Sequence, residues 1–281
     1  MNIERLRKII SYSDVHREEI DSKVKRFCSF AGIDYDRDLL NLLQIVRSSF
    51  NKKGTLVFEI PFADDEIGAL CYRGDGLGYV VLNTSLPRMN VNFAIAHEIW
   101  HVFFGSEEFV SKVEFAHDQY DEHEEEYAAN LFAGMLLMPE VSFRRLYLKF
   151  KEESEGDETG AIVRCMSYYQ VPYMAVLIRC LELGLIRRDA QLDGLLSMDA
   201  DQIKRHLEEH WLDESIMEPS LRDDYPHIEA LVDRIGSEFV ECKYINQRTV
   251  CKALEKMRKL YTKIKGGEET GSNSCANPRQ L

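Results

Sequence analysis

The sequence predicts an α+β fold in which a small sheet lies between helices and an all-helical region follows. Short apolar runs separated by turn residues are confined to residues 54–83, which favours a compact group of strands there. Longer segments with helical apolar spacing occupy most of the remaining chain. Hydrophobic residues make up 45% of the 281 residues, which is enough to bury a core and argues against a largely disordered chain.

Turn and helix-stop residues divide the first half of the chain into its elements. Residues 74–78 are rich in glycine and join the last two expected strands. Gly105 ends one long helix and Pro139 stops the next, with a polar, acidic loop between the two helices. The expected elements are two helices within 14–50, strands at 55–60, 67–72 and 79–83, and helices at 92–104 and 121–138.

A charged segment at residues 151–160 has no apolar side chain and is the best candidate for a linker. We therefore expect a first domain at 1–150 and a helical C-terminal region at 160–265. Within that region, residues 161–184 have the lengths and the break of a helix-turn-helix-like segment. Residues 266–281 have little to pack and are predicted to be a disordered tail. Further helices are expected at 199–209, 228–240 and 249–264.

The charge of the chain restricts its partners. Asp and Glu number 48 against 35 Lys and Arg, so the net charge is −13 and direct DNA binding is not expected. No stretch approaches the roughly 20 apolar residues needed to cross a bilayer, and the N-terminus has no signal core, so we expect a cytoplasmic protein without membrane contact. The seven cysteines are scattered without a Cys-x-x-Cys pair, which argues against a disulfide framework or a thiolate zinc knuckle.

The most specific motif is His-Glu-Ile-Trp-His at residues 97–101. On a helix, His97 and His101 share one face and Glu98 lies beside them, which is the arrangement of ligands that zinc needs. Hydrolytic zinc sites usually have three protein ligands and an open position for water, and Glu98 is the candidate general base. The inverted pattern at 206–210 lies on a mostly charged helix and is expected to be a solvated surface.

The third metal ligand is expected on the helix that follows. Ala129 and Ala133 form a small-residue stripe that would let this helix approach the metal helix closely, which makes Glu126 physically plausible. Spacing alone does not choose among four candidate ligands: Glu122, His123, Glu125 and Glu126.

Several further residues around these motifs form a recurring pattern. They are Leu82-Asn83, Pro87, residues 93–101, Glu126 with Ala129-Asn130 and Phe132-Ala133, and residues 136–139. With this pattern the chain resembles the ImmA/IrrE family of bacterial metallopeptidases. The resemblance is strong over residues 40 to 140 and looser to residue 260.

The resemblance implies a zincin-like, zinc-dependent endopeptidase in which a glutamate on the second helix completes the metal site. Counting back from Pro139 places that glutamate at Glu126. Members of the family commonly cleave or inactivate a helix-turn-helix transcriptional repressor, which releases stress, mobile-element or anti-phage defence genes, for example after DNA damage. Ala128 replaces an acidic residue frequent in the family, which supports Glu126 over a downstream ligand. Trp100 replaces a frequent glycine and could narrow the cleft or alter substrate choice.

Other side chains near the motif have candidate supporting roles. Asn130 could orient the Glu126 carboxylate, or simply form an interhelical hydrogen bond. Tyr120 or Tyr127 could donate to a developing oxyanion, although packing is the more ordinary role. Cys71 is a candidate regulatory thiol, but buried strand cysteines are usually inert.

Three segments leave alternatives open. Residues 79–82 resemble the edge strand on which zincins hold a peptide, but a central strand would give the same apolar run. The near-balanced charge around residues 161–184 favours protein docking over DNA reading. The cation-rich helix at 249–264 is either a closing helix or a docking site for an acidic partner. The alternative function is a non-proteolytic, metal-stabilised regulator that sequesters a repressor or binds DNA. No oligomeric state follows from the sequence.

Overall fold

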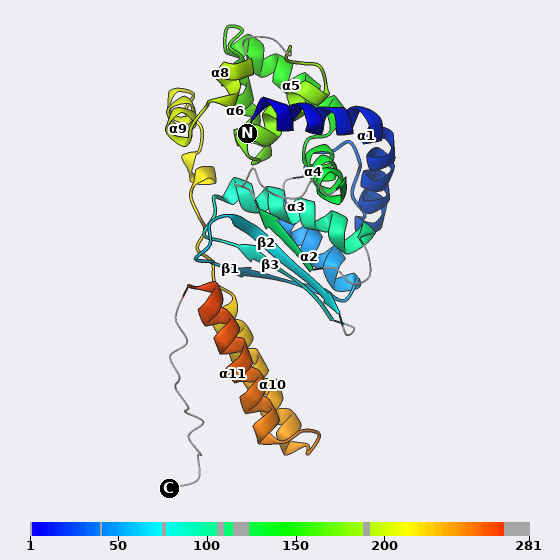
Figure 1. The fold of residues 1–281 in the computed structure, drawn as a ribbon, viewed down its shortest axis with the longest axis vertical. Coiled ribbons are helices and arrows are strands. Elements are labelled where there is room, and N and C mark those ends of the chain that lie inside the picture. The colour runs from blue at the N-terminus through cyan, green and yellow to red at the C-terminus, as the bar shows by residue number, and fades with distance from the viewer. Residues whose placement is uncertain are drawn as a thin grey trace.

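In this computed structural model the chain forms an α+β fold in which a four-stranded sheet lies beneath a body of helices, so the predicted fold class is confirmed (Figure 1). The structure describes residues 2–39, 41–74, 77–105, 110–114, 124–187 and 192–266. The strands are β1 (Thr55–Ile60), β2 (Ile67–Gly74), β3 (Leu77–Asn83) and β4 (Val110–Glu114). The helices are α1 (Ile3–Ala31), α2 (Leu42–Lys52), α3 (Arg88–Phe104), α4 (Glu124–Leu137), α5 (Glu140–Glu153), α6 (Glu158–Tyr169), α7 (Tyr173–Glu182), α8 (Leu192–Leu196), α9 (Ala200–Glu209), α10 (Tyr225–Glu241) and α11 (Gln247–Ile264), with a 3-10 helix η1 (Glu214–Met217).

The strand order is β1-β3-β2-β4, which places β3 in the interior of the sheet. β3 pairs in parallel with β1 and antiparallel with β2, and β4 adds to the other side of β2. The expectation that residues 79–82 form an edge strand is therefore wrong. Their apolar run reflects burial on both faces, since Val80 and Leu82 belong to the main core and Val81 to a second cluster on the opposite face. Between α3 and α4, where only a loop is expected, β4 forms an edge of the described sheet.

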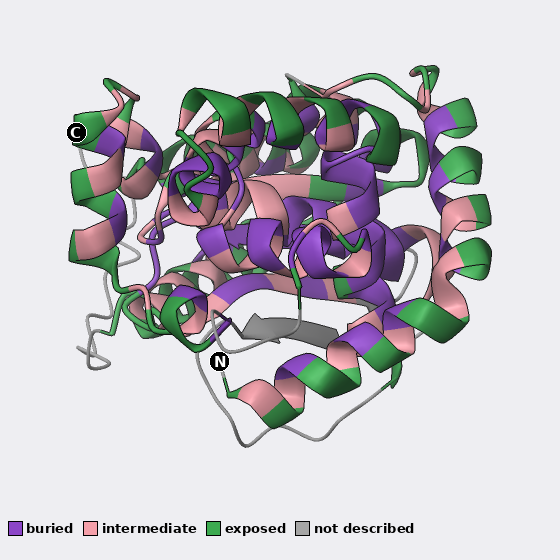
Figure 2. Ribbon diagram, turned by 90° about the horizontal axis from the view of Figure 1, so that it is seen from above, coloured by how far each residue is buried: buried purple, intermediate pink, exposed green. Residues whose placement is uncertain are grey.

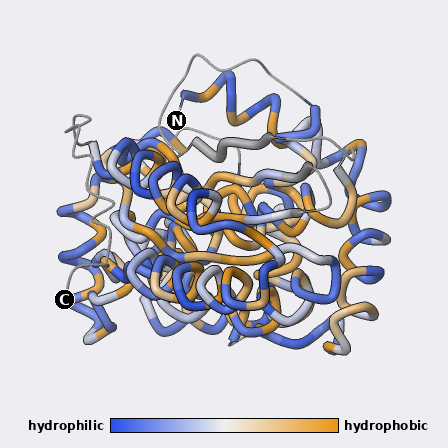
Figure 3. Tube along the Cα trace, turned by 90° about the horizontal axis from the view of Figure 1, so that it is seen from below, coloured by the Kyte–Doolittle hydropathy of each residue, from blue (hydrophilic) through white to orange (hydrophobic). Residues whose placement is uncertain are grey.

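One hydrophobic core extends from the sheet through the helical body. It contains buried residues from both sides of the expected linker, such as Phe27 and Ile99 before it and Ile162 and Leu177 after it. These buried residues gather in the middle of the molecule, with exposed and hydrophilic residues around them (Figures 2 and 3). Residues 151–160 form the end of α5, a turn and the start of α6, so the core has no boundary near residue 150.

The first helix is longer than its apolar spacing predicts. α1 begins at Ile3 instead of within 14–50, because the Asn2 side chain accepts a hydrogen bond from the Arg5 N–H and caps the first turn. It ends at Gly32, whose left-handed backbone (φ 73°) lets its N–H bond to the last carbonyls of the helix. The helix packs against α4 and α7 and brings its first turns close to the motif helices.

The helix-turn-helix-like segment is present as α6 and α7, joined through Gln170, which has a left-handed backbone, and Pro172. Every residue of α7 is buried or half-buried, because this helix packs against α1 and α4 in the core. As folded, α7 has no free face to place in a nucleic-acid groove.

The last two helices, α10 and α11, form a hairpin that projects from the sheet, away from the helical body (Figure 1). Its base is fixed by stacked rings of Tyr225 and Tyr261 beside Ile60, Phe62 and Val81. Of the predicted tail, all but its first residue lies outside the described residues. None of the described helices combines the length and apolar character needed to span a bilayer.

The Asp157 side chain caps α6 by accepting hydrogen bonds from the N–H groups of Thr159 and Gly160. Asp157→Ala is expected to lower the free energy of unfolding by about 1 kcal/mol, because it leaves these donors without that acceptor. Urea denaturation followed by circular dichroism measures the loss. Asp157→Asn keeps an acceptor and should retain most of the stability, so an equal loss in both variants would contradict capping.

Candidate metal centre

The motif helix α3 and the following helix α4 pack closely above the sheet. Ala129 and Ala133 of α4 are fully buried, as the small-residue stripe predicts for a close approach. Phe132 fixes the pair by packing edge-on against Trp100 and Phe104 of α3. This contact holds α3 against α4.

Three potential ligands converge where the two helices meet. The Nε2 atoms of His97 and His101 lie 3.0 Å apart. Glu126 places one carboxylate oxygen 3.2 Å from Nε2 of His97 and the other 3.6 Å from Nε2 of His101. Among the described residues, these three form the one group of such ligands, with all ligand atoms within 4.8 Å of one another. The structure thus brings together the three residues that we expect to hold the metal.

The donor set of this group fits zinc. Two imidazole nitrogens and one carboxylate oxygen are a ligand combination of catalytic zinc sites, which use three protein ligands and keep one position open. Both histidines are almost completely buried, at 1% and 2% exposure, and Glu98 is fully buried on the same helix. A buried cluster of this kind needs compensation for lost hydration, which a bound cation would provide.

Asn130 contacts His97 instead of the Glu126 carboxylate that we expect it to orient. Its Oδ1 lies 3.0 Å from Nδ1 of His97, so a proton on Nδ1 is donated to the amide and Nε2 is left for the metal. One turn from Glu126, Asn130 is therefore placed to set both the tautomer and the orientation of the ring.

Of the remaining ligand candidates, Glu125 lies beside Nδ1 of His101, the ring nitrogen that faces away from the convergent atoms. Its Oε1 is 3.7 Å from Nδ1 of His101, so the carboxylate can assist this histidine electrostatically. In the sequence, the only signal for this role is that Glu125 directly precedes Glu126. Helical spacing alone presents Glu125 as a candidate ligand and not as a residue that assists His101. The other two candidates, Glu122 and His123, lie outside the described residues.

The protein environment gives the two histidines different proton affinities. Burial lowers the pKa of His101 to about 3, so this imidazole is neutral, as a metal ligand must be. Burial also acts to lower the pKa of His97, but the hydrogen bond and negative charge of Glu126 outweigh it and raise the pKa. A proton held by His97 therefore competes with a metal ion for the same site.

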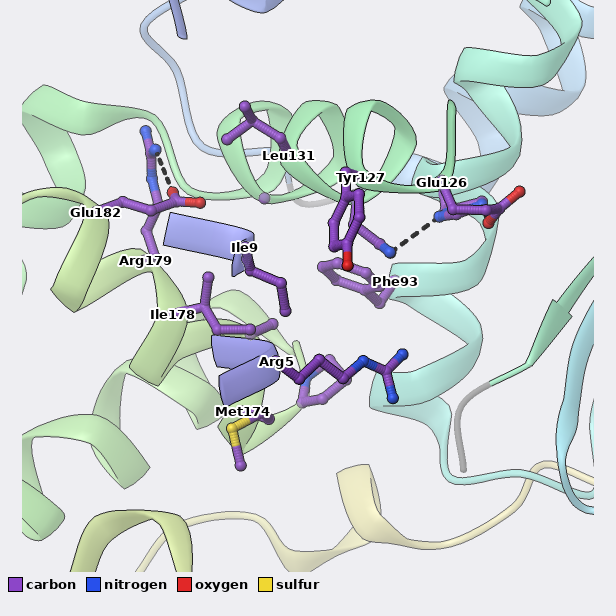
Figure 4. Close-up of a pocket in the computed structure, with 15 residues that line it drawn as sticks. Arg5, Ile9, Phe93, Glu126, Tyr127, Leu131, Met174, Ile178, Arg179 and Glu182 are labelled. Atoms are coloured by element: carbon purple, nitrogen blue, oxygen red, sulfur yellow. Dashed lines mark hydrogen bonds and ion pairs between the residues drawn. The ribbon is translucent and has the colours of Figure 1, made fainter. Parts of the chain in front are cut away.

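A pocket with mostly apolar walls adjoins two of the three ligands, His97 and Glu126 (Figure 4). His97 and Glu126 line one side, and the ion pair between Arg179 and Glu182 of α7, 3.0 Å apart, lines the other. Arg5 of α1 also borders it. The apolar lining residues are Ile9, Phe93, Leu131, Pro172, Met174, Ala175 and Ile178.

Trp100 does not line this pocket. Its ring packs against Phe104 and Phe132, and the ammonium of Lys23 lies 4.3 Å from its centre. The tryptophan therefore joins α3 to α1 and α4 and does not narrow the pocket, because it is not among the residues that line it.

Two other predicted residues, Tyr127 and Cys71, are not among the convergent ligands. Tyr127 lines the pocket and stacks on Tyr12, with ring centres 5.5 Å apart. Cys71 is buried in the hydrophobic core of the sheet and is not part of the ligand group. Tyr120 lies outside the described residues, and His206 and His210 do not belong to any ligand group among the residues described.

Comparison with known proteins gives one family. Residues 50–181 match the model of peptidase family M78, described as the IrrE N-terminal-like domain. The matched segment includes the whole sheet, α3 and α4, and therefore all three convergent ligands. It continues across residues 151–160 into α7, which agrees with the single core. No curated protein matches the chain.

Removal of the Asn130 amide should weaken metal binding. Asn130→Ala is expected to lower zinc affinity by about 10- to 100-fold, because the ring of His97 loses the acceptor that fixes its tautomer. Competition with a chromophoric zinc chelator measures this affinity. Asn130→Asp keeps an acceptor oxygen at the same place and should bind zinc at least as tightly as wild type. Unchanged affinity in Asn130→Ala would contradict the proposed contact.

Proposed function

We propose that the chain is a zinc-dependent endopeptidase of narrow specificity, on the basis of the match of residues 50–181 to the IrrE N-terminal-like domain of peptidase family M78. The observation that carries the proposal is the convergence of His97, His101 and Glu126 beside a pocket that His97 and Glu126 line. A site that held a metal only for stability would not need this adjoining space. The buried carboxylate of Glu98 on the same helix adds a group with acid-base chemistry.

The residues of the site divide the chemistry among them. When bound, zinc supplies the Lewis acidity that activates water and the scissile carbonyl. Glu98 takes the proton from the attacking water and delivers it to the amine that leaves. Asn130 keeps Nε2 of His97 directed at the metal through its contact with Nδ1.

The substrate in this proposal is an extended segment of a protein. The edge of the described sheet at β4 offers backbone groups for strand addition, in place of the central strand β3. The apolar walls of the pocket suit a large apolar side chain next to the scissile bond, and its position beside His97 and Glu126 places that side chain close to the reacting carbonyl.

We further propose a helix-turn-helix transcriptional repressor as the substrate, on the basis of the resemblance to the ImmA/IrrE family. Cleavage would derepress stress, mobile-element or anti-phage defence genes, for example after DNA damage, in the cytoplasm. The buried α7 supports a protein substrate over direct DNA reading, because it offers no free recognition helix. A metal-stabilised regulator that only sequesters the repressor is the second candidate, and the Glu98 variant below distinguishes the two.

Co-expression with a helix-turn-helix repressor encoded beside this chain tests the proposed cleavage. We expect two repressor fragments whose masses sum to the intact repressor plus one water. Glu98→Gln should retain zinc and produce no fragments, because it keeps the ligands and removes the base. His101→Ala should lose both the metal and the cleavage. Intact mass spectrometry and metal analysis provide the measurements.

Two outcomes of this experiment would contradict the proposal. Fragments that appear equally with Glu98→Gln would show that another group or another protease makes the cut. An intact repressor that forms an equally stable complex with wild type and Glu98→Gln would favour sequestration.

Filling the pocket should impair cleavage without harming the fold. Gly134 lies on α4 at the pocket wall, and a Cβ placed there meets nothing within 4 Å. Gly134→Leu is expected to lower the cleavage rate at least about tenfold, because the added side chain occupies the space for the substrate. Gly194→Leu on α8, where a Cβ also has open space, is the matched control. Equal rates in both variants would show that the pocket does not receive substrate.

A further inference from the structure

The α10–α11 hairpin buries little of its own surface. Among its described residues only Tyr225, Gly236, Val250 and Leu254 are buried, although the two helices contain 17 and 18 residues. The contact between them depends on Gly236, because a Cβ there would lie 2.6 Å from a methyl group of Val250. An isolated helix pair with so small a core is only marginally stable in water, so this hairpin has the character of an incomplete helix bundle.

Exposed apolar residues follow one face of the hairpin. On α10, Leu231, Ile235 and Phe239 recur every four residues and are 38%, 38% and 46% exposed. On α11, Leu260 is 60% exposed. The four-residue spacing places the α10 side chains in one stripe, beside the row that faces α11. Side chains of this kind at this spacing form the core when two helix pairs combine.

The two helices carry opposite charge. α10 contains four acidic residues and one arginine, whereas α11 contains six basic residues and one glutamate. Arg258 of α11 pairs with Glu229 of α10 across the hairpin. A surface that docks on this hairpin therefore meets a negative helix and a positive helix side by side.

We propose that the hairpin is a dimerisation element and that its apolar face is covered by the hairpin of a second copy of this chain. A twofold axis would place α10 of each copy against α11 of the other, so that negative meets positive twice in one four-helix bundle. A uniformly acidic partner would be attracted by α11 but repelled by α10. A uniformly basic partner would be attracted by α10 but repelled by α11. The second copy satisfies both helices at once.

The position of the hairpin also suits this arrangement. It projects away from the helical body (Figure 1), so two chains can join there while their bodies stay apart. This separation matters because each chain carries a net charge of −13, and the bodies would repel each other at close range. The metal centre lies in α3 and α4 and takes no part in the contact, so the inference is independent of the proposed peptidase activity.

Light scattering coupled to size-exclusion chromatography of the full chain tests this proposal. We expect wild type to have twice the chain mass of 32.6 kDa. Ile235→Lys should weaken the dimer at least about tenfold, because it places a charge in the apolar contact, and Leu260→Lys should do so from the other helix. Ala230→Lys adds the same charge at an exposed position five residues away, on another side of α10, and should leave the dimer intact.

Circular dichroism and zinc content of each variant show whether the chain is still folded. A wild-type chain that stays monomeric at a concentration of about 100 µM would overturn the proposal. A dimer that persists in both Ile235→Lys and Leu260→Lys would also overturn it, because the contact would then lie elsewhere. The proposal would also be overturned if the chain alone is a monomer and the hairpin binds only a different protein.

Discussion

The close approach of α3 and α4 is the constraint on which the candidate site depends. The histidines of α3 can share a ligand position with Glu126 only if the two helices nearly touch, and Ala129 and Ala133 make this possible because they add no bulk beyond a methyl group. Phe132 holds the pair from the other side by packing against Trp100. The sheet beneath and α1 beside these helices complete the core that keeps them in place.

This packing also creates an energetic demand. It buries two imidazoles and the carboxylate of Glu98, and such groups are costly to remove from water without partners. Asn130 on one ring and Glu125 near the other meet part of that cost, and both lie within one turn of Glu126 on α4. The first two turns of α4 therefore supply a candidate ligand and the two groups that orient the histidines opposite, so metal binding would be linked to the stability of the helix pair.

Local patterns predict much of this fold, and long-range relations account for what they miss. β1 has its predicted bounds, and the motif helix follows from helical spacing, because each depends on residues near one another in the sequence. Helical spacing leaves four candidates for the third ligand, and the family resemblance singles out Glu126 among them. The order of the strands does not follow from local patterns, because the central position of β3 depends on its pairing with β1 and β2. The charged residues 151–160 suggest a linker from sequence, but they form the end of α5, a turn and the start of α6. Exposed helix ends and linkers are both rich in charged residues, so composition does not distinguish them. The role of α7 as a pocket wall is likewise visible only in three dimensions.

The structure thus combines a group of three potential metal ligands with an exposed hairpin suited to association, joined through the sheet. We expect the three convergent ligands to hold one zinc ion. A crystal structure of the zinc-loaded full chain, with anomalous scattering recorded at the zinc edge, tests it most directly. We expect one strong peak within about 2.0–2.2 Å of Nε2 of His97, Nε2 of His101 and a carboxylate oxygen of Glu126. A peak at another place, or one whose third ligand is a residue other than Glu126, would contradict it.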